Sequence, residues 1–157
     1  MRKRIIPESS QHLPPSHHHW LDLERLAQVE LTSEAAAHPI ESALIPGTGT
    51  GWQASQPGEQ VIRLRFDEPL RLRRIRLVFP EEEQPRTQEF VLRWSPDDGQ
   101  SYREIVRQQY TFSPPATSRE VEDYGVELDG VTVLELSVMP DISGGGALAK
   151  VAQLQLA

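Results

Sequence analysis

Alternation of apolar and polar residues is the dominant pattern of the chain from residue 27 onward. It appears in 27–31, 62–66, 75–79 and 90–94, where every second residue is apolar. A period of two places successive side chains on opposite faces of an extended chain. Each of these segments therefore predicts a half-buried β-strand.

The second half of the chain repeats the pattern less regularly. Residues 105–112 suit an extended chain but are polar in the middle, and alternation returns in 124–128, 134–138 and 152–156. Together with the earlier segments this makes about eight strands and no long helix. Many short strands in one chain predict an all-β sandwich or barrel.

Turn-forming residues separate the predicted strands. Asp, Pro and Gly mark turns at 67–69, 95–99 and 129–130, since these residues favour the backbone conformations that tight turns require. The one helical signal is at 38–44, where Pro39 suits the first position of a short helical turn.

A chain of 157 residues is expected to form one domain. Residues 1–22 carry neither helical nor strand periodicity and contain several Pro and His residues. We predict that they form an N-terminal arm, and that residues 23–157 form the domain.

Composition narrows the classes of function. There is no Cys and therefore no disulfide or thiolate chemistry. A net charge of -7 opposes nucleic-acid binding through bulk electrostatics, because neutralising phosphates needs an excess of Lys and Arg. No apolar run has the length of a signal peptide or a membrane span. The sequence thus predicts a cytoplasmic protein that binds neither nucleic acid nor membrane.

Four short motifs occur in order along the predicted domain. They are IPG at 45–47 followed by TGW at 50–52, GEQVIRL at 58–64, the segment 85–90 that begins with Pro-Arg, and SPDDG at 95–99. In order and spacing the chain resembles the discoidin or coagulation factor type C domains and the related bacterial carbohydrate-binding modules. The resemblance implies a galactose-binding-like, eight-stranded jelly roll whose loops at one end hold a ligand.

The resemblance also implies candidate ligand-binding residues. Carried over by position they are Trp52 as an aromatic platform, Gln53 and Arg86, with Gln56 in the same loop region. The alternative for Trp52 is a buried core anchor, and for Arg86 an ion pair with a neighbouring glutamate. Pro46 occupies the position where calcium-binding members of the family have Asp, so the resemblance implies no calcium site. Gln53 occupies the position where many sugar-binding members have His.

Alternation also predicts a basic face on an acidic protein. Five arginines occupy outward positions of three predicted strands: Arg63, Arg65, Arg74, Arg76 and Arg93. Such a face would suit an anionic partner or an acidic patch of a second copy of the chain. The alternative is cross-strand pairing with Glu127 or Glu135.

Signals for catalysis or cofactors are weak. The acidic pairs fit chance in a chain with 23 Asp and Glu residues, and the His run at 17–19 fits adventitious rather than built metal binding. We predict no enzyme activity, no metal and no cofactor. The functional prediction is a non-catalytic carbohydrate-binding module, and the alternative is a cytoplasmic protein-interaction module that uses the arginine face.

Overall fold

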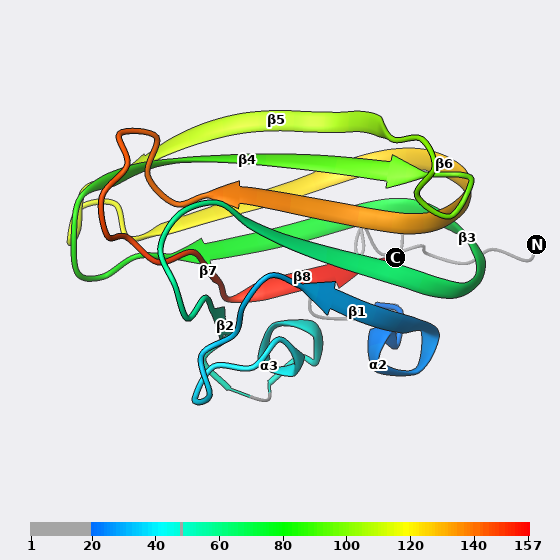
Figure 1. Cartoon of the computed structure of the whole chain (residues 1–157), viewed down its shortest axis with the longest axis horizontal. Coiled ribbons are helices and arrows are strands. Elements are labelled where there is room, and N and C mark those ends of the chain that lie inside the picture. The colour runs from blue at the N-terminus through cyan, green and yellow to red at the C-terminus, as the bar shows by residue number, and fades with distance from the viewer. Residues whose placement is uncertain (1–19, 48) are drawn as a thin grey trace, which may run out of the picture.

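Residues 20–47 and 49–157 are described by a computed structural model of the chain, and they form a two-layer β-sandwich (Figure 1). The strands are β1 (Ala27–Leu31), β2 (Trp52–Gln53), β3 (Gln60–Pro80), β4 (Arg86–Ser95), β5 (Arg103–Phe112), β6 (Arg119–Met139), β7 (Lys150–Val151) and β8 (Gln153–Leu156). Two helices of a single turn accompany them, α2 (Leu23–Leu26) and α3 (Glu41–Leu44). The predicted helical turn is confirmed in α3, which begins two residues after Pro39.

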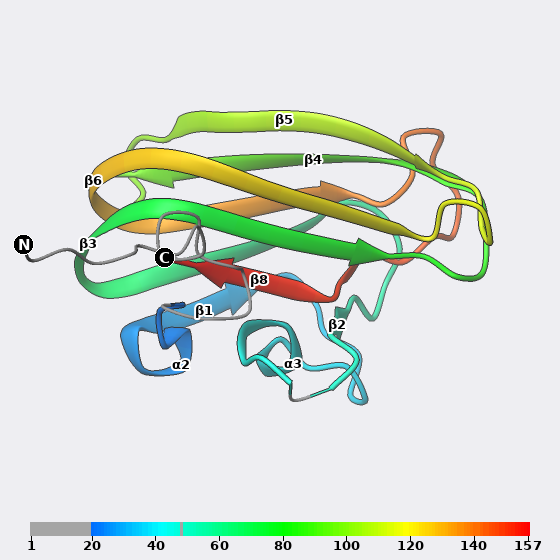
Figure 2. The same cartoon turned by 180° about the vertical axis from the view of Figure 1, so that it is seen from behind.

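The larger sheet has the strand order β1-β3-β6-β4-β5, and β8 pairs with the second half of β3. β3 and β6 run antiparallel over their whole length, from Gln60 opposite Val138 to Pro80 opposite Arg119. Their register shifts between Arg65 and Arg74. At this irregularity both strands double back, so that their two halves lie in different layers (Figures 1 and 2).

This doubling back changes the meaning of two predicted turns. Residues 67–69 and 129–130 lie inside β3 and β6 and are the bends at which the layers separate. Gly130 has a φ of 71° there, a conformation that glycine adopts at little cost. The strands predicted at 62–66 and 75–79 are thus the two halves of one strand.

The core fills the space between the layers. Ile62 and Leu64 in the first half of β3 are each 1% exposed, and Ile75, Leu77 and Phe79 in its second half are fully buried. Phe79 of β3 packs against Phe90 of β4 with ring centroids 5.0 Å apart. The predicted alternation therefore identifies the inward positions of both halves, but Val78, at a predicted outward position, is buried as well.

A second, two-stranded sheet pairs Trp52 with Val151 and Gln53 with Lys150. Gly51 enters it with a φ of 96°, and a Cβ atom on this residue would lie 2.5 Å from the Val151 carbonyl oxygen. The sequence pattern does not predict β2 and β7, because two-residue strands are too short to show a period.

Most of the predicted N-terminal arm, residues 1–19, lies outside the described residues. The last part of the arm contacts the domain, since the Leu21 amide donates a hydrogen bond to the Leu156 carbonyl at 2.7 Å. Among the described residues, no helix is long and apolar enough to cross a membrane.

Candidate functional site

A cleft of about 400 Å³ lies where the β2–β7 sheet meets the end of β3. Its walls come from the loop before β2, the acidic loop after β3, and the starts of β6 and β8. The polar and charged side chains of its lining include His38, Thr50, Gln53, Glu82, Glu83, Arg119 and Lys150. These segments are far apart in sequence and meet because β7 pairs with β2.

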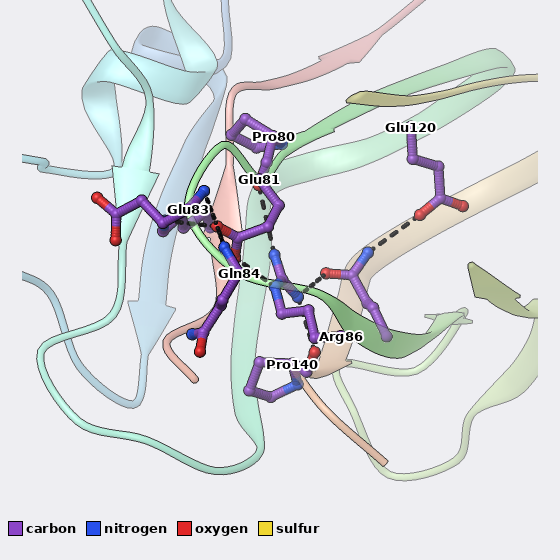
Figure 3. A network of polar contacts seen from close by, with 9 residues as sticks. Pro80, Glu81, Glu83, Gln84, Arg86, Glu120 and Pro140 are labelled. Carbon is purple, nitrogen blue, oxygen red and sulfur yellow. Dashed lines mark hydrogen bonds and ion pairs between the residues drawn. The ribbon is translucent and has the colours of Figure 1, made fainter. Parts of the chain in front are cut away.

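Behind the cleft, Arg86 and Glu81 form a buried ion pair with an Nε–Oε1 distance of 2.6 Å (Figure 3). Arg86 also donates to the Pro140 carbonyl at 2.7 Å and to Gln88 Oε1 at 3.1 Å. Its guanidinium lies over the Phe112 ring, 4.7 Å from the centroid.

Arg86 is therefore a structural residue, which corrects its assignment as a ligand contact. Its side chain has no exposed surface, and its donors are taken by carbonyl and carboxylate oxygens. The predicted alternative was an ion pair with a nearby glutamate. The structure confirms such a pair, but the glutamate is Glu81 rather than Glu82 or Glu83.

The Glu81 carboxylate is held in its charged form by four donors. Burial opposes ionisation, but the hydrogen bond from Arg86, the Glu83 amide and the charge of Lys150 together lower the pKa of Glu81. The amides of Glu83 and Gln84 donate to Oε2 at 2.9 and 3.4 Å, and this capping fixes the start of the acidic loop (Figure 3).

Trp52 corrects a second assignment. Only 1% of the residue is exposed, and its indole N–H donates to the Ser33 carbonyl at 3.1 Å. Neither face of a buried ring is available for stacking on a sugar. The predicted alternative, a core anchor, is the role that the structure gives it.

The two glutamines differ in position. Gln53 is half-buried in the cleft wall, and its side-chain amide has no hydrogen-bond partner among the described residues. Gln56 is exposed and outside the cleft, where its backbone carbonyl accepts a hydrogen bond from Gln60 at 3.4 Å. Of the four predicted ligand residues, Gln53 alone lies free in the cleft, and its role stays a prediction.

Lys150 is the main residue that the sequence reasoning missed. It faces Gln53 across the β2–β7 pair, and its ammonium lies 3.5 Å from Glu81 Oε2. The other cleft residues that the sequence did not indicate are polar as well. His38 Nδ1 and the Thr50 hydroxyl are hydrogen-bonded at 2.9 Å, while Glu82, Glu83 and Arg119 are exposed. The alternating small residues Ala147, Ala149 and Val151 were the available signal for this segment.

The predicted arginine face is divided between the two layers. Arg63 and Arg93 both contact Glu135, at 2.8 and 3.4 Å, and Arg65 pairs with Glu30 at 2.8 Å. Cross-strand pairing with Glu135, the predicted alternative, is confirmed.

Arg74 and Arg76 lie in the other half of β3, where both contact Asp123, at 2.7 and 3.5 Å. The bend in β3 separates them from the other three arginines, so the prediction of a single basic surface was wrong. Each of the five arginines has a carboxylate partner, which also reduces the positive charge available to an anionic protein.

Glu120 is a second buried carboxyl near this network. Its Oε1 accepts from Gln88 at 3.1 Å, and its Oε2 has no partner among the described residues. Burial, followed by the negative charge of the nearby Glu122, raises the pKa of Glu120 from 4.5 to about 9.

The pKa of Glu120 leads to a prediction about pH. The folded state keeps the Glu120 proton between pH 4.5 and about 9 while the unfolded state loses it, so this group's stabilising contribution is lost as pH rises. The loss is up to about 1.4 kcal/mol per pH unit. We expect Glu120→Gln to remove this loss and to be more stable than the parent at pH 8, as measured by urea unfolding at pH 5, 7 and 8.

Glu127→Gln, an exposed position of the same strand, is the control and should leave the pH dependence unchanged. A Glu120→Gln protein less stable than its parent at pH 8 would contradict the assignment of a neutral carboxyl.

Within residues 20–47 and 49–157, no three His, Asp or Glu side chains gather in a way that suits a metal ion. The His run at 17–19 lies outside the described residues.

Comparison with known proteins adds the class of fold. No protein-family model and no curated protein matches the chain in sequence. Solved structures do match over most of its length. The family 32 carbohydrate-binding module of AlyQ, in complex with 4,5-unsaturated mannuronic acid, has a TM-score of 0.64 at 13% identity, over 89% of this chain and 98% of its own.

Two further matches are similar in extent. The family 32 module of NanJ from C. perfringens, in complex with galactose, has a TM-score of 0.64 at 13% identity, over 87% of this chain and 96% of its own. A GH29 fucosidase from Ruminococcus gnavus has a TM-score of 0.63 at 10% identity, over 87% of this chain and 26% of its own. The chain thus has the galactose-binding-like jelly-roll fold of the carbohydrate-binding modules, as the sequence predicted.

Proposed function

We propose that this protein is a non-catalytic carbohydrate-binding module that holds its ligand in the cleft beside the β2–β7 sheet. The main observation in favour of this proposal is that the side-chain amide of Gln53 lies free in a cleft of about 400 Å³. Planar amides and carboxylates that are not already hydrogen-bonded suit the hydroxyls of a sugar ring. The fold supports this proposal, because its similar structures include modules whose names state a bound sugar.

The cleft differs from an aromatic sugar site. Trp52 is buried, and apart from the His38 imidazole no other aromatic ring is among the described residues that line the cleft. Binding would therefore depend on hydrogen bonds, which contribute roughly 1 kcal/mol each when solvent competes. We expect dissociation constants in the millimolar to high micromolar range. The location of the protein in the cytoplasm stays a prediction.

A glycan array followed by calorimetry on the bound sugars tests the proposal. Gln53→Ala should weaken binding by about fivefold to thirtyfold, because one or two hydrogen bonds of roughly 1 kcal/mol each are lost. Gln28→Ala, an exposed glutamine on β1 outside the cleft, is the matched control and should bind as the parent does. Absence of binding to every sugar at millimolar concentration would overturn the proposal.

A further inference from the structure

The charges around the cleft point to one class of sugar. Three ionised side chains form a cluster here: Glu81 and Lys150 line the cleft and Arg86 lies behind it, with side chains that are 1%, 19% and 0% exposed. The only carboxylate of the three is shared by two cations. This cluster of three therefore carries one positive charge in excess, although Glu82 and Glu83 also line the cleft and the whole protein has a net charge of -7.

Glu81 is more strongly bound to Arg86 than to Lys150. Arg86 donates to Oε1 at 2.6 Å, and the amides of Glu83 and Gln84 occupy Oε2. Lys150 contacts the same Oε2 only at 3.5 Å. An ammonium has three protons to donate, and this one contact is the only partner of Lys150 among the described residues. Most of its donor capacity is directed to the cleft.

A second cation lines the same cleft. Arg119 stands at the start of β6, opposite Pro80 in the sheet, and its side chain forms no ion pair with any described residue. Two cations from different strands thus converge on one space. Their separation in sequence, 31 positions, is bridged by the fold.

The cleft also contains carboxylates, but these differ in burial from Lys150. Glu82 and Glu83 are exposed, and Figure 3 shows the Glu83 carboxylate pointing away from the Glu81–Arg86 pair. Solvent and salt screen exposed charges, whereas buried charges are screened much less. Arg119 is exposed as well, so its charge is screened like those of the two glutamates. Lys150 is therefore the least screened cation that lines the cleft, and the exposed glutamates offer acceptors for hydroxyl groups.

We propose that the ligand is a carboxylate-bearing sugar, a hexuronic acid residue, with its carboxylate on Lys150 and Arg119 and its hydroxyls toward Gln53 and the exposed glutamates. This inference rests on the proposed function and adds the class of sugar. A neutral hexose would leave Lys150 with only its 3.5 Å contact to a carboxylate that it shares with Arg86. A hexuronate supplies that partner and keeps the ring hydroxyls.

Calorimetry with three pairs of sugars tests the inference: galacturonate and galactose, glucuronate and glucose, mannuronate and mannose. Members of a pair differ only in the carboxylate. At least one uronate is expected to bind about tenfold more tightly than its neutral partner, and the difference should shrink as salt is raised. Lys150→Met should lower the ratio of uronate affinity to neutral-sugar affinity to about one.

Arg71→Met is the matched control, because it removes one positive charge at an exposed position distant in the fold, paired with Asp129. Arg119→Gln is a second cleft variant, at an exposed position where a substitution should not disturb folding. It tests the inference even if Lys150→Met fails to fold. Neutral sugars that bind as tightly as the uronates would overturn the inference and leave the proposed function intact. Failure of all six sugars and of the glycan array would overturn both.

Discussion

Replacing Arg86 with methionine is expected to lower the free energy of unfolding by about 3–5 kcal/mol, because it leaves the buried Glu81 carboxylate without its main partner. The Pro140 carbonyl and the Gln88 side chain would lose donors at the same time. Urea unfolding at pH 7, followed by circular dichroism, measures the loss.

Two variants separate the buried pair from surface effects. Arg107→Met removes an arginine of the same sheet that pairs with Glu89 and Glu104 but is 48% exposed, and should cost less than about 1 kcal/mol. The double variant Arg86→Met with Glu81→Met should recover part of the lost stability, since no unpaired buried charge remains. A loss below 1 kcal/mol for Arg86→Met would mean that this arginine is free to contact a ligand.

Gly51→Ala is expected to destabilise the protein by at least about 2 kcal/mol, because the added methyl group meets backbone in a conformation that alanine rarely adopts. Its Cβ would lie 2.5 Å from the Val151 carbonyl oxygen and 2.6 Å from the Ala152 Cα. The clash separates β2 from β7, so sugar binding should weaken with the fold. Thermal unfolding and calorimetry on the same samples measure both effects.

Gly58→Ala is the matched control for the backbone strain. Gly58 has a φ of 89°, close to the 96° of Gly51, but nothing lies within 4 Å of its added Cβ. Its cost should stay near about 1 kcal/mol, and sugar binding should be unchanged. Equal losses in the two variants would show that strain alone, and not contact with β7, explains the effect.

Alternation in the sequence predicted which residues are buried, but not in which layer they lie. A period of two assigns each residue of β3 to the inner or outer side, and the inner positions Ile62, Leu64, Ile75 and Leu77 are indeed buried. The bend at 67–70 moves the second half of the strand into the other layer. Arg63 and Arg74 therefore share the outward side but not a common face.

Motif positions located the site region without assigning the roles of its residues. Trp52 and Arg86 lie beside the cleft, but long-range partners bury them: the Ser33 carbonyl for the indole, and Glu81 with Pro140 for the guanidinium. Lys150 reaches the cleft only because β7 pairs with β2, 98 positions away in the chain. Contacts of that kind depend on the topology, which a local pattern does not contain.

Mapping of backbone amide shifts by NMR during a sugar titration tests the location of the binding site most directly. With galacturonate, glucuronate or mannuronate, we predict shifts concentrated at residues 50–53, 81–83 and 150–153, around the cleft. Amides of the outer face near Arg63 and Arg93 should stay unchanged. Shifts on that outer face, or along the edge of β1, with none at the cleft would contradict the account.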